Sequence, residues 1–193
     1  SNKNAVMAST QRDLIAGEVS KDLTRRLILP EKISKAHDEG AIHFHDADYF
    51  VQPIFNCCLI NVGDMLDNGT VMNGKLIESP KSFQVACTVM TQIIASVASS
   101  QYGGQSVDIR HLGKYLRRSY EKFKLTIKAE VGDSVADEVV ERLTKRRLQD
   151  ELRSGVQTIQ YQINTLMTTN GQSPFVTIFL ICRRTMNIWK KMQ

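Results

Sequence analysis

The chain has 193 residues, of which 42% are hydrophobic and 23% charged, and its formal net charge is +5. This length supports one domain with a real core, and the basic residues are spread along predicted helices instead of forming a tract for direct nucleic-acid binding. No apolar stretch reaches the roughly 18 residues that a membrane span needs. The four cysteines include no CxxC pair and suggest no disulfide framework. We therefore expect a cytoplasmic protein with reduced thiols and no membrane contact.

Both ends suggest a piece of a longer protein. The chain opens with Ser1 and Asn2, without a methionine, and residues 182–193 form a basic tail with no hydrophobic pattern. We expect residues 1–181 to be the structured part and residues 182–193 to be a disordered or non-native tail. A truncation and a frameshift near codon 181 would both produce such a tail.

Helices and turns alternate at the start of the chain. Apolar residues at intervals of about four predict a helix over residues 10–27, which Pro30 ends. Residues 31–38 are expected to form a second helix that Gly40 stops. Residues 41–61 are rich in β-branched and aromatic side chains with turn signals between them, which predicts short strands and loops. Further turns are predicted at Asn68-Gly69 and Asn73-Gly74.

Ser79 and Pro80 are expected to begin a distinctive helix, as its N-cap and its first helical residue. No charged residue occurs between Lys81 and Asp108, so one face of this helix is apolar and the other is small and neutral. We expect such a helix to be buried on both sides, either deep in a large protein or against a second subunit. Its predicted apolar ridge consists of Val85, Ala86, Val89, Met90, Ile93, Ile94, Val97 and Ala98.

Three elements complete the pattern. A charged amphipathic helix is predicted over residues 108–129, and a second helical stretch over residues 134–167, with a break near Gly155. A turn at residues 170–174 then leads into an apolar strand over residues 175–181. The fold class is therefore mostly α with a few strands (α/β), and these strands are too few to close a sheet of their own.

Cys57 and Cys58 form the most informative pair of side chains. They are adjacent in an apolar, strand-forming run. Successive residues of a strand face opposite sides, so one thiol is expected in a site and the other in the core. The pair could also be plain core, since free cysteine often packs as a small hydrophobic residue.

A second cluster, His43-Phe44-His45-Asp46, precedes the cysteines. Two histidines that alternate along an extended segment point to the same face. With Asp46 and Asp48 they could bind a divalent metal, although a third ligand at defined spacing is missing. Alternatively, the His45–Asp46 pair orders a loop by hydrogen bonding, or a histidine serves as donor or base near Cys57.

Five strings in the same order resemble the anaerobic (class III) ribonucleotide reductases. They lie at residues 43–49, 55–60, 79–82, 99–104 and 164–177. The resemblance covers residues from about 10 to about 180. It implies a fragment of the ten-stranded α/β barrel shared with pyruvate formate-lyase, with an ATP-cone upstream of Ser1.

The resemblance also implies an activity and its cofactors. Ribonucleoside triphosphates would become deoxyribonucleoside triphosphates for DNA replication, by glycyl and thiyl radical chemistry with formate as reductant. An S-adenosylmethionine iron–sulfur activase would install the glycyl radical. The thiyl cysteine, the radical glycine and a structural zinc site would lie beyond Gln193. We therefore expect no cofactor or metal bound in this chain and no turnover by the chain alone.

The family's site residues transfer onto this sequence by motif. Cys57 matches the second active-site cysteine, and Asn56, His43 and His45 would line the substrate site. The family also carries an allosteric site for deoxynucleotide and ATP effectors at its homodimer interface. Effector contacts are expected at Glu78, Lys81, Gln92 and Lys124. Lys81 has an independent reason to hold phosphate, because it is predicted in the first turn of a helix.

Two other functions are compatible with the same sequence. Another glycyl-radical enzyme of the formate-lyase kind shares the vicinal cysteines, but the Lys81 region and the string at residues 101–104 argue against it. A non-catalytic dNTP-binding helical dimerisation module would dimerise and bind nucleotide without a reactive thiol in a pocket.

Overall fold

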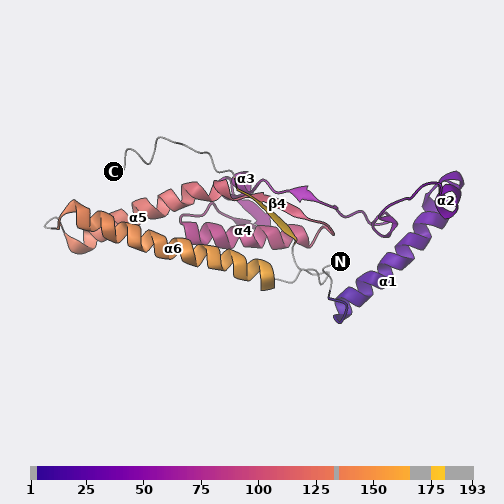
Figure 1. The fold of residues 1–193 in the computed structure, drawn as a ribbon, viewed down its shortest axis with the longest axis horizontal. Helices are drawn as coiled ribbons and strands as arrows, with labels where there is room; N and C mark the ends of the chain where they lie inside the picture. The colour runs from indigo at the N-terminus through magenta and orange to yellow at the C-terminus, as the bar shows by residue number, and fades with distance from the viewer. Residues whose placement is uncertain (1–3, 133–134, 166–174, 181–193) are drawn as a thin grey trace. The chain divides into compact units, whose positions relative to one another are not determined.

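The computed structural model describes residues 4–132, 135–165 and 175–180. The chain is mostly helical with a few short strands, which confirms the predicted class (Figure 1). It divides into two compact units, the first built from Ser1–Leu59, Met90–Gln105 and Gln157–Val176, and the second from Ile60–Val89, Ser106–Val156 and Thr177–Gln193. The predicted turn at residues 170–174 and the tail at residues 182–193 lie outside the described residues.

The first unit begins with helices at the predicted places. Helix α1 spans Ala8–Leu23, a π-helical turn, η1, follows at Thr24–Ile28, and α2 spans Glu31–Asp38. Gly40 has a φ of 74°, a backbone conformation that favours glycine, which explains why α2 stops there.

The apolar spacing of α1 does not mark its packing face. Ile15 and Val19 are 66% and 54% exposed. The helix instead packs on the short 3-10 helix η2 (Ala47–Tyr49) through small and polar residues. Ser20 and Thr24 both donate side-chain hydrogen bonds to the carbonyl oxygen of Ala47, at 3.3 and 3.1 Å.

A three-stranded sheet has the order β1-β4-β5, with β1 at Cys58–Leu59, β4 at Gln105–Asp108 and β5 at Val176–Phe179. The amide of Cys58 donates to the carbonyl of Gly104 at 3.1 Å, and the amide of Ile60 donates to the carbonyl of Ser106 at 3.0 Å. Because these bonds advance in the same direction on both segments, β1 and β4 run parallel. The predicted strand at residues 175–181 is confirmed with narrower bounds.

Strand β4 was not predicted from the sequence, because only one of its buried residues is apolar. Val107 and Gln105 are both buried. The Gln105 amide nitrogen donates to the carbonyl of Ile94 at 2.9 Å, and this bond offsets part of the cost of burying a polar side chain. A buried glutamine removes the hydrophobic alternation by which a central strand is normally recognised.

The second unit opens with helix α3 (Val62–Asp67) and a hairpin. Strands β2 (Thr70–Met72) and β3 (Lys75–Ile77) pair antiparallel, with Val71 opposite Leu76. Asn73 and Gly74 both have positive φ, at 51° and 75°, as a type I′ hairpin turn requires. This confirms the turn predicted there.

Helix α4 (Phe83–Ala98) begins later than predicted, so Ser79 and Pro80 are not its N-terminal residues. The first free amides find acceptors that the local sequence does not reveal. Phe83 N donates to Ser119 Oγ at 2.9 Å, and Gln84 N donates to the carboxylate of Glu151 at 3.1 Å. Lys81 consequently precedes the helix and does not lie in its first turn.

Only one side of α4 is buried in this chain. Its buried residues include Ala86, Met90, Ile93, Ile94 and Ala98, and also Cys87 and Thr91. The neutral face, which includes Thr88, Gln92 and Ser96, is exposed, as is Val85. In the chain by itself only one side is therefore covered, and burial of the neutral face in a larger protein or against a second subunit stays a prediction.

Helices α5 (Gly113–Val131) and α6 (Asp137–Thr165) follow a 3-10 turn, η3, at Ile109–Leu112. In the second unit they lie side by side as a hairpin (Figure 1), joined by ion pairs such as Lys128–Asp137 at 3.0 Å. Among the described residues, no helix is long and apolar enough to cross a membrane.

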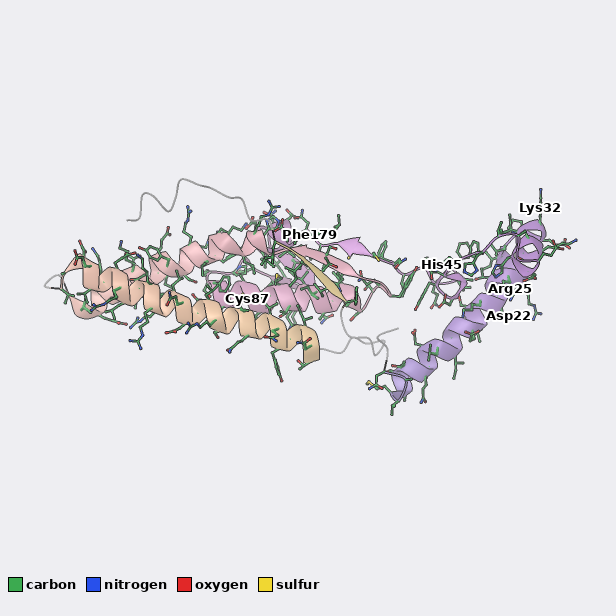
Figure 2. All side chains as sticks on the ribbon, viewed as in Figure 1. Asp22, Arg25, Lys32, His45, Cys87 and Phe179 are labelled. Carbon is green, nitrogen blue, oxygen red and sulfur yellow. The ribbon has the colours of Figure 1, made fainter. Side chains whose placement is uncertain are left out.

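The predicted break of the last helix near Gly155 is wrong, because α6 continues through it. Gly155 is buried against α4, and a Cβ atom there would lie 2.5 Å from Phe83 Cε1 and 2.9 Å from Cys87 Sγ. Cys87 is labelled on α4 in Figure 2. The glycine therefore permits the close approach of two helices.

Candidate functional site

The cysteine segment is held by the glycine-containing loop at residues 101–104. Phe55 forms a parallel bridge with Gln101, and the amide of Tyr102 donates to the carbonyl of Phe55 at 3.0 Å. The amide of Gly103 donates to the carbonyl of Asn56 at 2.7 Å. Two of the strings behind the family resemblance, more than forty residues apart, therefore lie side by side in the first unit.

Gly103 is needed for this pairing. A Cβ atom at position 103 would overlap with both the backbone oxygen and the side-chain oxygen of Asn56. Only glycine lets the loop approach so closely, which gives a steric reason for the first glycine of the Gly103-Gly104 pair.

The two adjacent thiols have different environments. Cys57 is exposed, and its Sγ donates to the side-chain oxygen of Asn56 at 3.3 Å. Cys58 is half-buried, and its Sγ donates to Gln101 Oε1 at 3.0 Å. Burial, with a smaller effect of the neighbouring Cys57, raises the pKa of Cys58. Cys57 is thus the accessible thiol, while Cys58 is held protonated beside it.

Gln101 and Tyr102 contact the cysteine segment, and the sequence did not single them out as candidates. Gln101 is only 2% exposed, and its amide nitrogen donates to the carbonyl of Gly103 at 3.0 Å. Both residues belong to a string used for the resemblance, and this was the only signal that could have found them.

The predicted histidine pair does come together. The rings of His43 and His45 are 5.6 Å apart, and His37 from α2 adds a third imidazole 5.4 Å from His43. His45 is labelled on its loop in Figure 2. His37 was missed, since nothing in its spacing connects it to the later pair. The three imidazoles line a cavity of about 300 Å³, together with Lys21, Arg25, Phe44, Asp46, Ala47 and Asp48.

Asp46 connects this histidine loop to the cysteine-holding loop. Its Oδ2 accepts a hydrogen bond from Tyr102 Oη at 2.7 Å and lies 2.6 Å from His45 Nδ1. Tyr102 also stacks on Tyr49, with ring centroids 3.8 Å apart and planes 9° from parallel. Asp46 itself has a left-handed φ of 56°, which aspartate tolerates better than most residues.

The two partners of this hydrogen bond shift each other's ionisation. Burial pushes the pKa of Asp46 upward, but the hydrogen bonds with Tyr102 and His45 outweigh it, so the net pKa lies below the usual value. Burial and the hydrogen bond to Asp46 raise the pKa of Tyr102 to about 12. At neutral pH the pair is therefore a phenol donating to a carboxylate, which is a charge-assisted bond.

The structure does not bring the histidines directly to the cysteine. In the part of the chain that is described, no hydrogen bond or ring contact joins His43 or His45 to Cys57, and the connection runs through Asp46 and Tyr102. The same described residues contain no group of three or more His, Cys, Asp or Glu side chains suited to hold a metal ion.

The predicted effector residues of the second unit fall into separate surroundings. Lys81 lines an open depression of about 570 Å³ with Arg118, Glu121, Lys122, Leu125 and Thr126. Lys124 lies elsewhere on α5, 3.6 Å from the carboxylate of Glu141 and over the ring of Tyr120. Glu78 is exposed. Arg118, which donates to the carbonyl of Pro80 at 2.9 Å, is a cation near Lys81 that the sequence did not reveal.

Gln92 is also a predicted effector residue, and it lies in the first unit. It is exposed on the neutral face of α4. The structure therefore leaves its side chain accessible.

Comparison with known proteins gives a consistent result. The profile of the family described as anaerobic ribonucleoside-triphosphate reductase matches residues 1–191. The chain is 42% identical over 179 residues to the protein of that name from Haemophilus influenzae, and 40% identical over 183 residues to the one from Enterobacteria phage T4. These alignments cover 91% and 92% of this chain but 25% and 29% of the two relatives, so the chain spans about a quarter of their length. The chain belongs to the anaerobic ribonucleoside-triphosphate reductase family.

Proposed function

We propose that this chain forms part of the catalytic barrel of an anaerobic ribonucleotide reductase and that it supplies the Cys57 thiol to the ribose of the substrate. The observation that carries the proposal is the parallel pairing of residues 55–58 with residues 101–104. This pairing holds an exposed thiol at a fixed place beside Asn56, where a nucleotide could reach it.

The chemistry suits a thiol in this position. Reduction at the 2′ carbon of ribose needs a hydrogen donor held against the sugar, and a thiol gives up hydrogen readily once a radical is nearby. In the complete reductase, a glycyl radical installed by an S-adenosylmethionine activase supplies the oxidising equivalent, and formate is the overall reductant. Asn56, His43 and His45 would bind the nucleotide, and a structural zinc would lie outside this chain.

The remaining features of the family are part of the same proposal. The substrates are ribonucleoside triphosphates, and the effectors are ATP and deoxynucleoside triphosphates bound at a homodimer interface. The enzyme would act in the cytoplasm, where thiols are kept reduced. The exposed, uncharged face of α4 supports the homodimer, because the solvent-facing side of a surface helix usually carries charged residues.

The test of Cys57 uses the full-length reductase that contains this chain, activated anaerobically and supplied with formate and nucleotide. Cys57→Ser is expected to abolish dNTP formation while the glycyl-radical electron paramagnetic resonance signal persists. Cys58→Ser is the matched control and should retain activity, since a serine can still donate to Gln101. Activity that survives Cys57→Ser would refute the assignment.

The effector site has its own test on the chain as it stands. Titration calorimetry with the four dNTPs is expected to show saturable binding that Lys81→Ala weakens, because Lys81, Arg118 and Lys122 line one depression. Lys75→Ala, an exposed lysine on the hairpin, should leave binding unchanged. Equal binding by both variants would remove Lys81 from the effector site. If the full-length protein binds dNTPs but its Cys57 thiol proves unreactive, the result would favour the non-catalytic dNTP-binding module.

A further inference from the structure

We propose that Tyr102 and Asp46 are positioning residues for the active-site thiols, acting through the loop at residues 101–104. This inference rests on the proposed function of Cys57. Neither residue carries a role in that proposal, and neither is expected to touch the substrate.

The cysteine segment has little else to hold it. Strand β1 contains only two residues, and Phe55, Asn56, Cys57 and Leu59 are all exposed. The hydrogen bonds to the loop at residues 101–104 therefore determine where the thiols lie.

Tyr102 is the centre of that loop. The residue before it, Gln101, accepts the hydrogen bond from Cys58 at 3.0 Å. The residue after it, Gly103, donates to Asn56 at 2.7 Å. These two contacts to the cysteine segment flank one side chain, and Tyr102 itself donates its amide to the carbonyl of Phe55, so an anchor on Tyr102 restrains them together.

The anchor comes from the histidine loop. The Tyr102 hydroxyl donates to Asp46 at 2.7 Å, and the ring stacks on Tyr49 at 3.8 Å. Asp46 is in turn bound to His45 at 2.6 Å. A chain of contacts therefore runs from His45 through Asp46 and Tyr102 to both thiols.

Thiol alkylation measures this anchor on the chain itself, without catalysis. Rates at Cys57 and Cys58 would be followed by peptide mass spectrometry. Tyr102→Phe keeps the stacked ring and removes only the hydroxyl, so the alkylation rate of Cys58 is expected to rise on the order of tenfold, the effect of losing one charge-assisted hydrogen bond. Asp46→Ala should raise it by a similar factor, and the double variant should exceed neither single variant by much, because both remove the same bond.

A matched control lies in the second unit. Tyr120 donates to Glu141 at 2.6 Å, which is also a bond from a tyrosine to a carboxylate. Tyr120→Phe is expected to leave the Cys58 rate unchanged. The positioning role is wrong if Tyr102→Phe does not change the Cys58 rate in a folded chain, or if Tyr120→Phe raises it equally through general loosening.

The full-length reductase provides a second readout that a purely structural role would not produce. Tyr102→Phe should lower kcat while the KM for the nucleotide stays unchanged, and Asp46→Asn should retain more activity than Asp46→Ala because its side-chain oxygen still accepts. A parallel fall in stability and in kcat, with KM also raised, would overturn the positioning role. If the alkylation result holds but Cys57→Ser reductase is active, then the proposed function fails and the anchor stands.

Discussion

At Gly103 two backbone segments approach so closely that no side chain fits between them. The overlap would involve both oxygens of Asn56, the residue that accepts a hydrogen bond from Cys57. The close approach depends on the single residue Gly103. A substitution there is therefore expected to affect both the stability of the chain and the position of the Cys57 thiol.

Gly103→Ala is therefore expected to destabilise the chain by about 1–3 kcal/mol, as over-packing usually does. Chemical denaturation would measure the free energy of unfolding. Gly113→Ala is the control, since nothing lies within 4 Å of a Cβ atom there, and it should be neutral or stabilise by about 0.4–1 kcal/mol. Equal effects of the two substitutions would contradict the close approach.

Asp46 predicts a dependence of stability on pH. Its pKa in the folded chain lies below the ordinary 3.8, so the fold favours the ionised form. The unfolded chain then binds more protons at acid pH, and the contribution of Asp46 is present above about pH 4 and lost as pH falls through the folded pKa. The difference in unfolding free energy between the wild type and Asp46→Asn should shrink between pH 5 and pH 2. A constant difference would show that Asp46 is not ionised in its hydrogen bonds.

Helix α4 illustrates how neighbouring elements decide the ends and the packing of a helix. Its first amides are bound by Ser119 of α5 and Glu151 of α6, so the helix begins where tertiary acceptors are available. Gly155 of α6 then lets the two helices meet at Phe83 and Cys87. The same contact buries the Cys87 thiol. This burial, with a smaller effect of the Glu151 charge, raises the pKa of Cys87 to about 12.

Gly155→Ala should destabilise the chain by about 1–3 kcal/mol, because the new methyl group would meet the Phe83 ring. Phe83→Leu removes the atom nearest to that methyl group, Cε1. The double variant should therefore be more stable than the sum of the two single changes predicts, with a coupling of about 0.5–3 kcal/mol in a denaturation cycle. Strict additivity would mean that the helices separate without strain.

Exposed apolar side chains characterise the whole molecule. In the first unit Ile15 is 66% exposed and Val19 54%, and in the second unit Val71 is 66% exposed and Leu125 72%. The chain also spans about a quarter of the length of its relatives. Surfaces that a complete reductase could cover are therefore open in the chain alone.

Self-association is the expected consequence. Sedimentation velocity should show a mass that grows with protein concentration, and Ile15→Lys with Val19→Lys should shift the distribution toward monomer. Gln11→Lys adds the same kind of charge at an exposed polar position of α1 and should shift it less per added charge. A wild-type chain that stays monomeric over the whole concentration range would contradict this.

The sequence by itself determined what depends on neighbouring residues. Local patterns predicted the helix at residues 31–38, its stop at Gly40 and the Asn73-Gly74 turn, because turn and helix propensities act over a few residues. The family assignment followed from short motifs that can be read directly from the sequence. The start of α4, the continuity of α6 through Gly155 and the buried strand β4 did not. Each depends on a partner far along the chain: an acceptor for an amide, a close-packed ring, or a carbonyl for a buried glutamine. The same reason explains why a motif could single out Cys57 as a candidate, whereas the contacts of Gln101, Tyr102 and Asp46 around the cysteine segment were decided only by the tertiary structure.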